Sequence, residues 1–172
     1  GYWNVFDPTN GFTAISVLAL ETVPFHKVAK RYFFETDMLF RLGLSKAVVI
    51  DIPMKAVYAD ENSSLRISRV LFEFMWKHLI IAGKRIYYTY FLREFSIATL
   101  FLVFGILFFS FGSIFGAAQW FESIATGTAA TSGTVMLSGV PLILGFQMLM
   151  AFLSHDYAIV PRVPIQLLRR RS

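Results

Sequence analysis

Two carboxylates lie inside an apolar run near the start of the chain. Glu35 and Asp37 belong to the segment FFETDMLFRL at 33–42, among Phe, Met and Leu. An ionised carboxylate is costly to bury unless a cation or hydrogen-bond donors accompany it. Three interpretations compete for these acids: a helix cap, a buried ion pair with Arg41, or part of an active site that includes a general base.

A helix cap accounts for only one of the two acids. Thr36 or Asp37 would begin a short helix that runs to Arg41, with Gly43 as its C-terminal stop. Glu35 would then have no role, although Arg41 or His26 could pair with either acid. The local pattern favours this structural interpretation and leaves the chemical one open.

Two further polar clusters flank this segment. DPTNGF at 7–12 combines Asp-Pro with Asn-Gly, which is typical of a turn. ADENSSL at 59–65 is a polar loop that follows the β-branched run AVVIDIPMKAVY at 47–58. That run predicts a strand with an edge or bulged continuation where a proline interrupts it. With a helix expected at 13–23, residues 1–64 predict an α/β fragment.

The second half of the chain resembles a membrane protein. Apolar residues make up 56% of the 172, and all 16 Lys and Arg lie at or before Arg93 or at or after Arg162. Two uncharged stretches, 96–118 and 134–153, are long enough as helices to cross a hydrocarbon core of about 30 Å. We expect a transmembrane hairpin at 96–155 rather than two core helices of a soluble protein.

The placement of charge predicts the orientation of this hairpin. The connecting loop, 119–133, contains no Lys or Arg, whereas Arg93, Arg162 and the run 169–171 flank the pair. The positive-inside rule then places both termini, including a basic tail at 156–172, in the cytoplasm. The net charge of +5 is expected to face an anionic membrane surface and not a nucleic acid.

Residues 65–95 connect the two halves. One stripe at about 100° per residue is formed by Arg66, Arg69, Glu73, Lys77 and Lys84, and the rest is largely Leu, Ile, Phe, Trp and Tyr. The pattern predicts amphipathic juxtamembrane helices on the membrane surface, broken near Ala82-Gly83. A core helix of a soluble domain is the alternative.

The three clusters, DPTNGF, FFETDMLFRL and VIDIPMKAVYADENSSL, occur in this order before an amphipathic segment and two spans. Together they resemble family 2 glycosyltransferases, and within them the polyprenyl-phosphate glycosyltransferases that include dolichol-phosphate mannose synthase-like enzymes. The resemblance covers nearly the whole chain, which corresponds to the C-terminal part of such an enzyme. It implies that residues 1–64 are the acceptor-side part of a GT-A nucleotide-sugar domain.

The implied activity is that of a membrane hexosyltransferase in cell-envelope glycan synthesis. It would transfer a single sugar from a nucleotide-sugar to a polyprenyl phosphate or another lipid-linked acceptor, at the cytoplasmic face of a bacterial inner membrane. The Gln-x-x-Arg-Trp motif of processive synthases is absent from the sequence, which favours single transfer.

The resemblance also implies a role for each cluster. Asp37 and Glu35 match the acidic motif that supplies a general base when the acceptor is a sugar hydroxyl. With a phosphate acceptor the attacking oxygen is already anionic, and the acid would orient groups or bind metal instead. The implied acceptor-binding residues are Asp7, Asn10, Gly11, Ser63, Ser64, Arg66 and Arg69. A solvated polar loop is the alternative for residues 59–65.

No motif in the sequence matches the part of these enzymes that binds the nucleotide-sugar donor. The family holds its nucleotide-sugar and a divalent cation, Mg²⁺ or Mn²⁺, with an Asp-x-Asp motif, and none occurs here. The resemblance therefore implies a donor-binding half upstream of Gly1, and a chain that is inactive alone. The alternative is a non-catalytic two-span membrane protein that acts as a partner or scaffold. Glycines in both spans would let helices approach closely and would allow packing between copies as a homo-oligomer.

Overall fold

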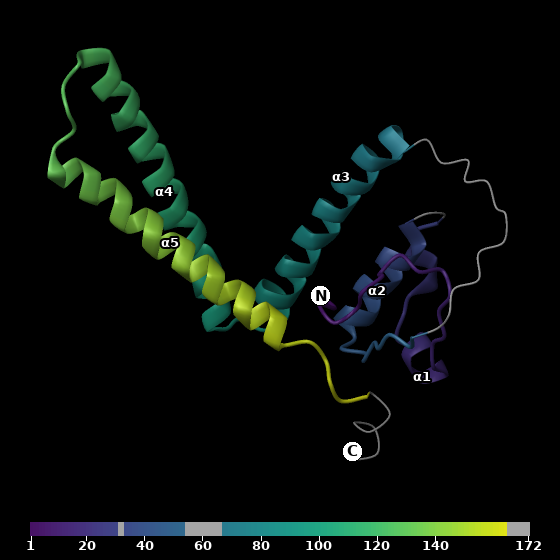
Figure 1. Cartoon of the computed structure of the whole chain (residues 1–172). Coiled ribbons are helices and arrows are strands. Elements are labelled where there is room, and N and C mark those ends of the chain that lie inside the picture. The colour runs from purple at the N-terminus through teal and green to yellow at the C-terminus, as the bar shows by residue number, and fades with distance from the viewer. Residues whose placement is uncertain (31–32, 54–66, 165–172) are drawn as a thin grey trace. The chain divides into compact units, whose positions relative to one another are not determined.

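The computed structural model describes residues 1–30, 33–53 and 67–164 (Figure 1). The chain divides into two compact units, Gly1–Thr89 with Ile159–Ser172, and Tyr90–Ala158. The elements in chain order are α1 (Val17–Leu20), the short 3-10 helix η1 (Phe25–Lys27), α2 (Phe34–Leu44), α3 (Ile67–Ile86), the π-helix η3 (Tyr87–Arg93), α4 (Ile97–Thr126) and α5 (Ser132–Ala158).

The predicted α/β fold class is wrong, because the described residues contain helices and no strand. Residues 47–53 are extended, as the β-branched run predicted, and the rest of that run lies outside the described residues. The extended segment bonds to the N-terminal residues at a constant offset of 45 positions, through side chains. The bonds run from the Tyr2 hydroxyl to the Ala47 carbonyl (2.5 Å), from Asn4 Nδ2 to the Val49 carbonyl (2.7 Å), and from the Phe6 N–H to Asp51 Oδ2 (2.6 Å).

These three bonds explain why an extended segment is not a strand. A strand pairs its backbone N–H and C=O groups with those of a neighbour about 4.8 Å away. Here the side chains of Tyr2 and Asn4 satisfy the carbonyls that such a neighbour would pair, and Asp51 accepts an N–H. The polar groups are paired without a backbone ladder.

A small core holds this unit together. Its buried members are Val23, Met38, Leu42 and Ala47, with Tyr2, Ile15, Ala19, Val28 and Val49 packed around them. α2 supplies Met38 and Leu42, which share one helix face because they are four residues apart. The helix expected at 13–23 is reduced to α1, whose N-cap Ser16 hydroxyl accepts the Ala19 N–H.

α2 ends later than predicted. Gly43 does not stop the helix and lies within it, because Lys46 supplies the left-handed residue instead, with φ of 56°. The Ala47 N–H bonds the Leu42 carbonyl at 3.0 Å and the Lys46 N–H bonds the Gly43 carbonyl at 3.1 Å. This is the Schellman arrangement, in which a left-handed residue beyond the helix satisfies its last carbonyls.

α3 confirms the helix expected in the juxtamembrane segment, but the predicted break at Ala82-Gly83 does not occur. One face of α3 packs against Phe33, whose ring lies 5.9 Å from that of Phe74 and 5.2 Å from that of His78. Exposed apolar side chains cover another face: Phe72, Met75, Trp76, Leu79 and Ile80. The departure from α-helical geometry comes later, in η3.

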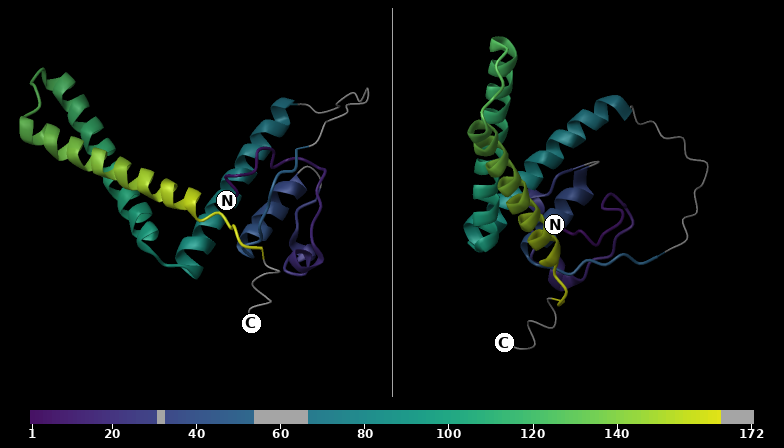
Figure 2. Two further views of the ribbon diagram at one scale, coloured as in Figure 1. Left: turned by 60° about the horizontal axis from the view of Figure 1, so that its bottom comes forward. Right: turned by 60° about the vertical axis from the view of Figure 1, so that its left-hand side comes forward.

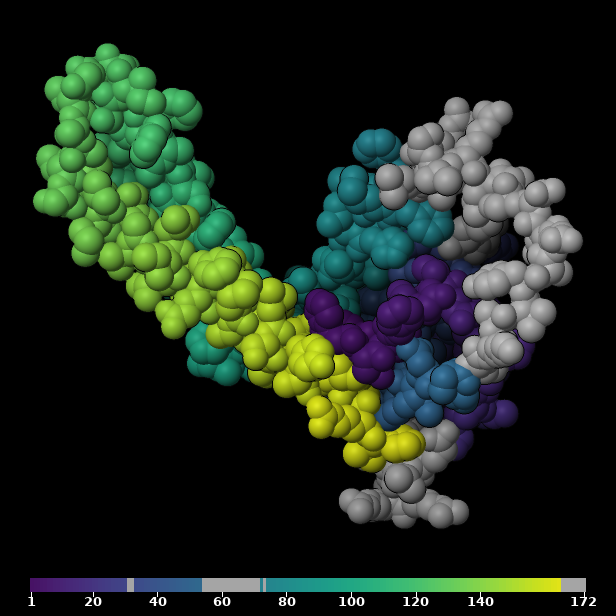
Figure 3. Space-filling model, in the orientation of Figure 1, coloured from purple at the N-terminus to yellow at the C-terminus, as the bar shows by residue number. Residues whose placement is uncertain are grey.

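α4 and α5 lie side by side as a hairpin in both views of Figure 2, and Figure 3 shows their side chains in contact along it. Both helices extend beyond the predicted spans, and residues 119–126 of the predicted loop are helical. α4 ends at Gly127, whose φ of 66° is the left-handed conformation that glycine adopts readily.

Both hairpin helices are long and apolar enough to cross a membrane. Core helices of soluble proteins can meet the same criterion, but they are mostly buried. Only 22% and 11% of the apolar windows of α4 and α5 are buried inside the protein. Their exposed apolar surface supports the predicted membrane hairpin, and the sidedness of the termini stays a prediction.

Candidate functional site

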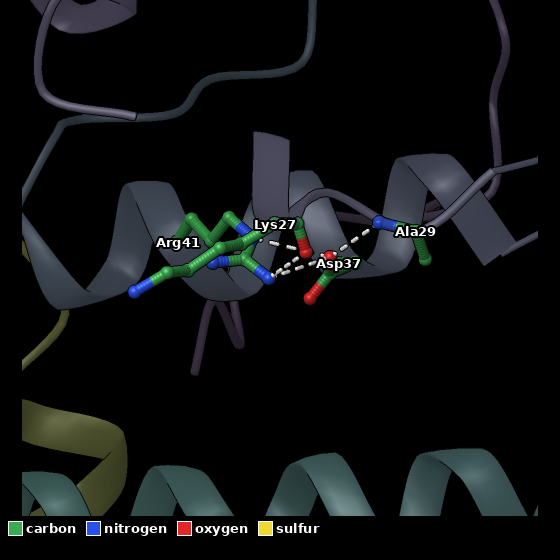
Figure 4. Close-up of polar contacts among 4 residues, drawn as sticks. All are labelled: Lys27, Ala29, Asp37 and Arg41. Atoms are coloured by element: carbon green, nitrogen blue, oxygen red, sulfur yellow. Dashed lines mark hydrogen bonds and ion pairs between the residues drawn. The ribbon is translucent and has the colours of Figure 1, made fainter. Parts of the chain in front are cut away.

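Asp37 lies in the first turn of α2 and only 6% of the residue is exposed. All its hydrogen bonds reach one carboxylate oxygen, Oδ2 (Figure 4). The donors are the Ala29 N–H at 2.7 Å, Arg41 Nε at 3.1 Å and Arg41 Nη2 at 3.0 Å. Arg41 Nη2 also donates to the Lys27 carbonyl. The ion pair between Asp37 and Arg41 is confirmed, whereas neither Thr36 nor Asp37 is the N-cap of α2, which is Phe33.

This geometry explains how an acid is retained among apolar residues. The i,i+4 spacing places Asp37 and Arg41 on the same helix face. Charge-assisted hydrogen bonds compensate the carboxylate for the loss of water. Removing Arg41 would leave a nearly buried charge unpaired, which typically costs about 3–5 kcal/mol.

The second carboxylate oxygen of Asp37, Oδ1, does not take part in these hydrogen bonds. Within the part of the chain that the structure describes, Oδ1 accepts no hydrogen bond. A carboxylate has about four lone-pair positions on its two oxygens. Asp37 is therefore anchored through one oxygen, while the other retains the capacity to accept a hydrogen bond or a proton from a ligand.

The segment at 7–12 forms the turn that its sequence predicted. Asp7 Oδ1 accepts the N–H of Thr9 at 3.1 Å and its hydroxyl at 2.8 Å. Asn10 Oδ1 accepts the Phe12 N–H at 2.9 Å. Both are local side-chain-to-backbone bonds of the Asx type, which bend the chain. Asp7 and Asn10 therefore shape the turn, although both residues are exposed.

Two of the predicted site clusters meet at the start of α2. A Cβ added to Gly11 would lie 3.9 Å from Glu35 Oε1, an ordinary van der Waals separation. Glu35 is half-buried in the same first turn that contains Asp37. Between them, Thr36 Oγ1 is buried and has no hydrogen-bond partner among the described residues. The structure thus brings Gly11 near Glu35, in the turn that contains Thr36, whose hydroxyl does not act as the predicted helix cap.

The other predicted acceptor-binding residues are not placed. Ser63, Ser64 and Arg66 lie outside the described residues, and of Arg69 the structure describes only the helical backbone in α3. The divalent cation that the resemblance implies stays a prediction. Over residues 1–30, 33–53 and 67–164, no three His, Asp or Glu side chains gather as a metal site would require.

A second polar cluster lies in the hairpin unit, and sequence reasoning missed it. The Tyr90 hydroxyl donates to Asp156 Oδ1 at 2.7 Å, and Thr99 Oγ1 donates to the Tyr90 carbonyl at 2.8 Å. All three residues are at most 1% exposed. The cluster joins η3 to both long helices. The sequence feature that could have indicated this cluster is Asp156, because an acid next to a membrane span generally has a specific partner.

Comparison of the chain with protein-family models, curated proteins and solved structures gives no match. The resemblance to glycosyltransferases therefore rests on the sequence motifs.

Proposed function

We propose that this chain forms the acceptor side and the membrane anchor of a family 2 glycosyltransferase. The enzyme would transfer a single sugar from a nucleotide-sugar to a polyprenyl phosphate or another lipid-linked acceptor. The observation that supports the proposal is the proximity of Gly11 to Glu35, since a Cβ built on Gly11 would lie 3.9 Å from Glu35 Oε1. The resemblance assigns the turn at 7–12 and the acidic segment to the acceptor side, so their proximity is what the proposal expects.

The anchored carboxylate fits either class of acceptor. With a hydroxyl acceptor, Asp37 Oδ1 would take the hydroxyl proton as that oxygen attacks C1 of the donor sugar. The bond from C1 to the donor phosphate oxygen breaks, and the nucleoside diphosphate leaves with the bonding electrons. With a phosphate acceptor no proton needs to be removed, and Asp37 would orient the neighbouring groups. In both cases the bonds to Oδ2 fix the direction of the carboxylate.

The donor would be bound by residues outside these 172, because the sequence contains no Asp-x-Asp motif. Exposed apolar side chains next to the extended segment support a further packing partner. Phe6 is 97% exposed, Ile50 69% and Ile52 68%. Large apolar groups gathered on a surface typically mark an interaction site. We propose that the donor-binding part covers this face.

The membrane elements would hold the site at the level of the lipid headgroups. α3 exposes Trp76, Leu79 and Ile80 on a face that does not contact Phe33, as an interfacial helix requires. We propose that α3 lies on the cytoplasmic surface of a bacterial inner membrane, with both termini on that side, as the arginines of the flanks predict. A lipid-linked acceptor would present its phosphate at this depth.

The test is sugar transfer to lipid by the full-length polypeptide that contains this chain. Membranes are supplied with radiolabelled nucleotide-sugars, and label is counted in the organic extract. Asp37→Asn preserves the size of the side chain and removes its charge. For a hydroxyl acceptor it should reduce kcat by about 100-fold or more, the usual contribution of a general base.

Arg41→Met is the matched control, because it breaks the ion pair and retains the carboxylate, to which the Ala29 N–H still donates. A catalytic Asp37 predicts a much larger loss of kcat in Asp37→Asn than in Arg41→Met. Equal losses of activity, in step with equal losses of thermal stability, would reduce Asp37 to a structural role. Full activity of Asp37→Asn would exclude it as a base.

A non-catalytic two-span partner or scaffold protein is the second candidate. The ion pair of Asp37 with Arg41 favours it, because that pair explains the buried acid without any chemistry. This candidate predicts that no nucleotide-sugar gives labelled lipid, and that Asp37→Asn affects only stability.

A further inference from the structure

Gln147 carries the only side-chain amide in α5, and it lies near the middle of that helix. The residue is exposed, and its side chain forms no hydrogen bond within the described part of the chain. In a membrane, this exposed position faces hydrocarbon, where an amide has no water to bond. Gln147 therefore needs a partner that a single hairpin does not supply.

Gln147 belongs to an exposed stripe on α5. Its members alternate at spacings of four and three residues: Met136, Val140, Ile143, Gln147, Met150 and Ser154. This alternation is the spacing of a coiled-coil seam. Gly145, where α5 comes closest to α4, lies two positions from both Ile143 and Gln147. Two positions correspond to about 200° around the helix, so the stripe faces away from this contact.

We propose that a second copy of this chain packs on this stripe, with Gln147 hydrogen-bonded to the partner's Gln147. The amide has both donors and an acceptor, so two equivalent amides can satisfy one another. Copies inserted in the same direction place this residue at the same depth, as a two-fold axis along the membrane normal requires. Interhelical bonds of this kind stabilise helix association in membranes.

The packing of the hairpin explains why association would not use Gly112 or Gly145. Both are already occupied by the contact of α4 with α5, where backbone atoms approach the position of an added Cβ within 3 Å. The stripe, in contrast, is exposed and open to a second copy. The proposal does not depend on whether the protein transfers sugar.

The absence of cysteine from the chain allows a direct test with single-cysteine variants. Ile143→Cys and Met150→Cys place a thiol on the stripe, on either side of Gln147. Leu144→Cys is the control: the residue is 45% exposed but lies about 100° from Ile143 and about 120° from Met150 around the helix. Each full chain is reconstituted in phospholipid vesicles, oxidised, and separated on non-reducing gels.

The proposal predicts disulfide-linked dimers for Ile143→Cys and Met150→Cys, and little dimer for Leu144→Cys. Adding Gln147→Leu to Ile143→Cys should weaken association about three- to thirty-fold, the range for interhelical polar bonds in membranes. Equal cross-linking at 143 and 144 would indicate random collision and overturn the proposal. Single-molecule photobleaching counts the copies in each vesicle. If it finds only monomers at every ratio of protein to lipid, lipid covers the stripe and the proposal is overturned. Cross-linking at 143 that Gln147→Leu does not weaken would overturn the role of the amide.

Discussion

Substitution of Gly145 by alanine tests the closest approach of the two long helices. The added Cβ would lie 2.3 Å from Phe109 N, 2.8 Å from Phe109 Cα and 2.9 Å from the Gly105 carbonyl oxygen. All three are backbone atoms, which cannot rotate out of the way. Ordinary contacts begin at 3.4 Å, so the helices must separate locally by about 1.1 Å (3.4 minus 2.3).

A separation of this size has a predictable energetic effect. A gap of about 0.5–1 Å already forfeits a quarter to a half of the dispersion energy between facing atoms. Packing is a main source of helix association in lipid, where the hydrophobic effect between helices is absent. We therefore expect Gly145→Ala to destabilise the hairpin by about 1–3 kcal/mol, the usual range for overpacking. Gly112→Ala should follow closely, because its Cβ would meet backbone atoms of Leu142 and Ser138 at 2.7 Å.

Gly139→Ala is the matched control in the same helix, since no atom lies within 4 Å of its added Cβ. Hairpin stability is measured by titrating SDS into mixed micelles that each hold one copy, with circular dichroism as the signal. Pulsed electron spin resonance between labels on α4 and α5 reports the helix separation. The predicted order of destabilisation is Gly145→Ala, then Gly112→Ala, then Gly139→Ala with no loss. Equal separation and equal stability for Gly145→Ala and Gly139→Ala would refute the close packing.

Three further predictions concern other parts of the chain. Burial raises the pKa of Tyr2 above its ordinary value, because desolvation disfavours the phenolate. Stability from Tyr2 should be complete below pH of about 10 and decline above it. Tyr2→Phe should remove this alkaline decline in urea melts followed by Trp3 fluorescence in a Trp76→Phe, Trp120→Phe background. Tyr90→Phe should destabilise the hairpin unit by about 1–3 kcal/mol in the SDS titration, because it removes the buried hydrogen bond from the Tyr90 hydroxyl to Asp156, whereas the exposed Tyr157→Phe should be neutral. In a Trp3→Phe, Trp120→Phe background, Trp76 is the only tryptophan, and lipids brominated near the headgroup should quench its fluorescence. Absence of quenching would show that α3 does not lie in the membrane interface.

Local signals in the sequence predicted the local parts of the structure. The length and uncharged character of 96–118 and 134–153 were sufficient to locate two long helices. The spacing of Asp37 and Arg41 was sufficient to propose their ion pair. The predicted break at Ala82-Gly83 does not occur. A glycine within a helix costs only about 1 kcal/mol of helix stability, which the neighbouring turns can offset.

Features that depend on distant contacts were not predictable from one sequence. A β-branched run becomes a strand only when another backbone lies beside it, and here residues 47–53 meet the side chains of Tyr2 and Asn4 instead. Tyr90 and Asp156 are 66 positions apart, and no local pattern connects them. The exposure of Gln147 became apparent only once the face of α5 that contacts α4 was known.

The most direct test of the proposed function is the transfer of labelled sugar to lipid by membranes that contain the full-length polypeptide. The account predicts label in the organic extract with at least one nucleotide-sugar. For a hydroxyl acceptor, the label should fall by about 100-fold or more in Asp37→Asn and far less in Arg41→Met. Absence of labelled lipid with every nucleotide-sugar, from protein that remains folded and membrane-inserted, would contradict the account.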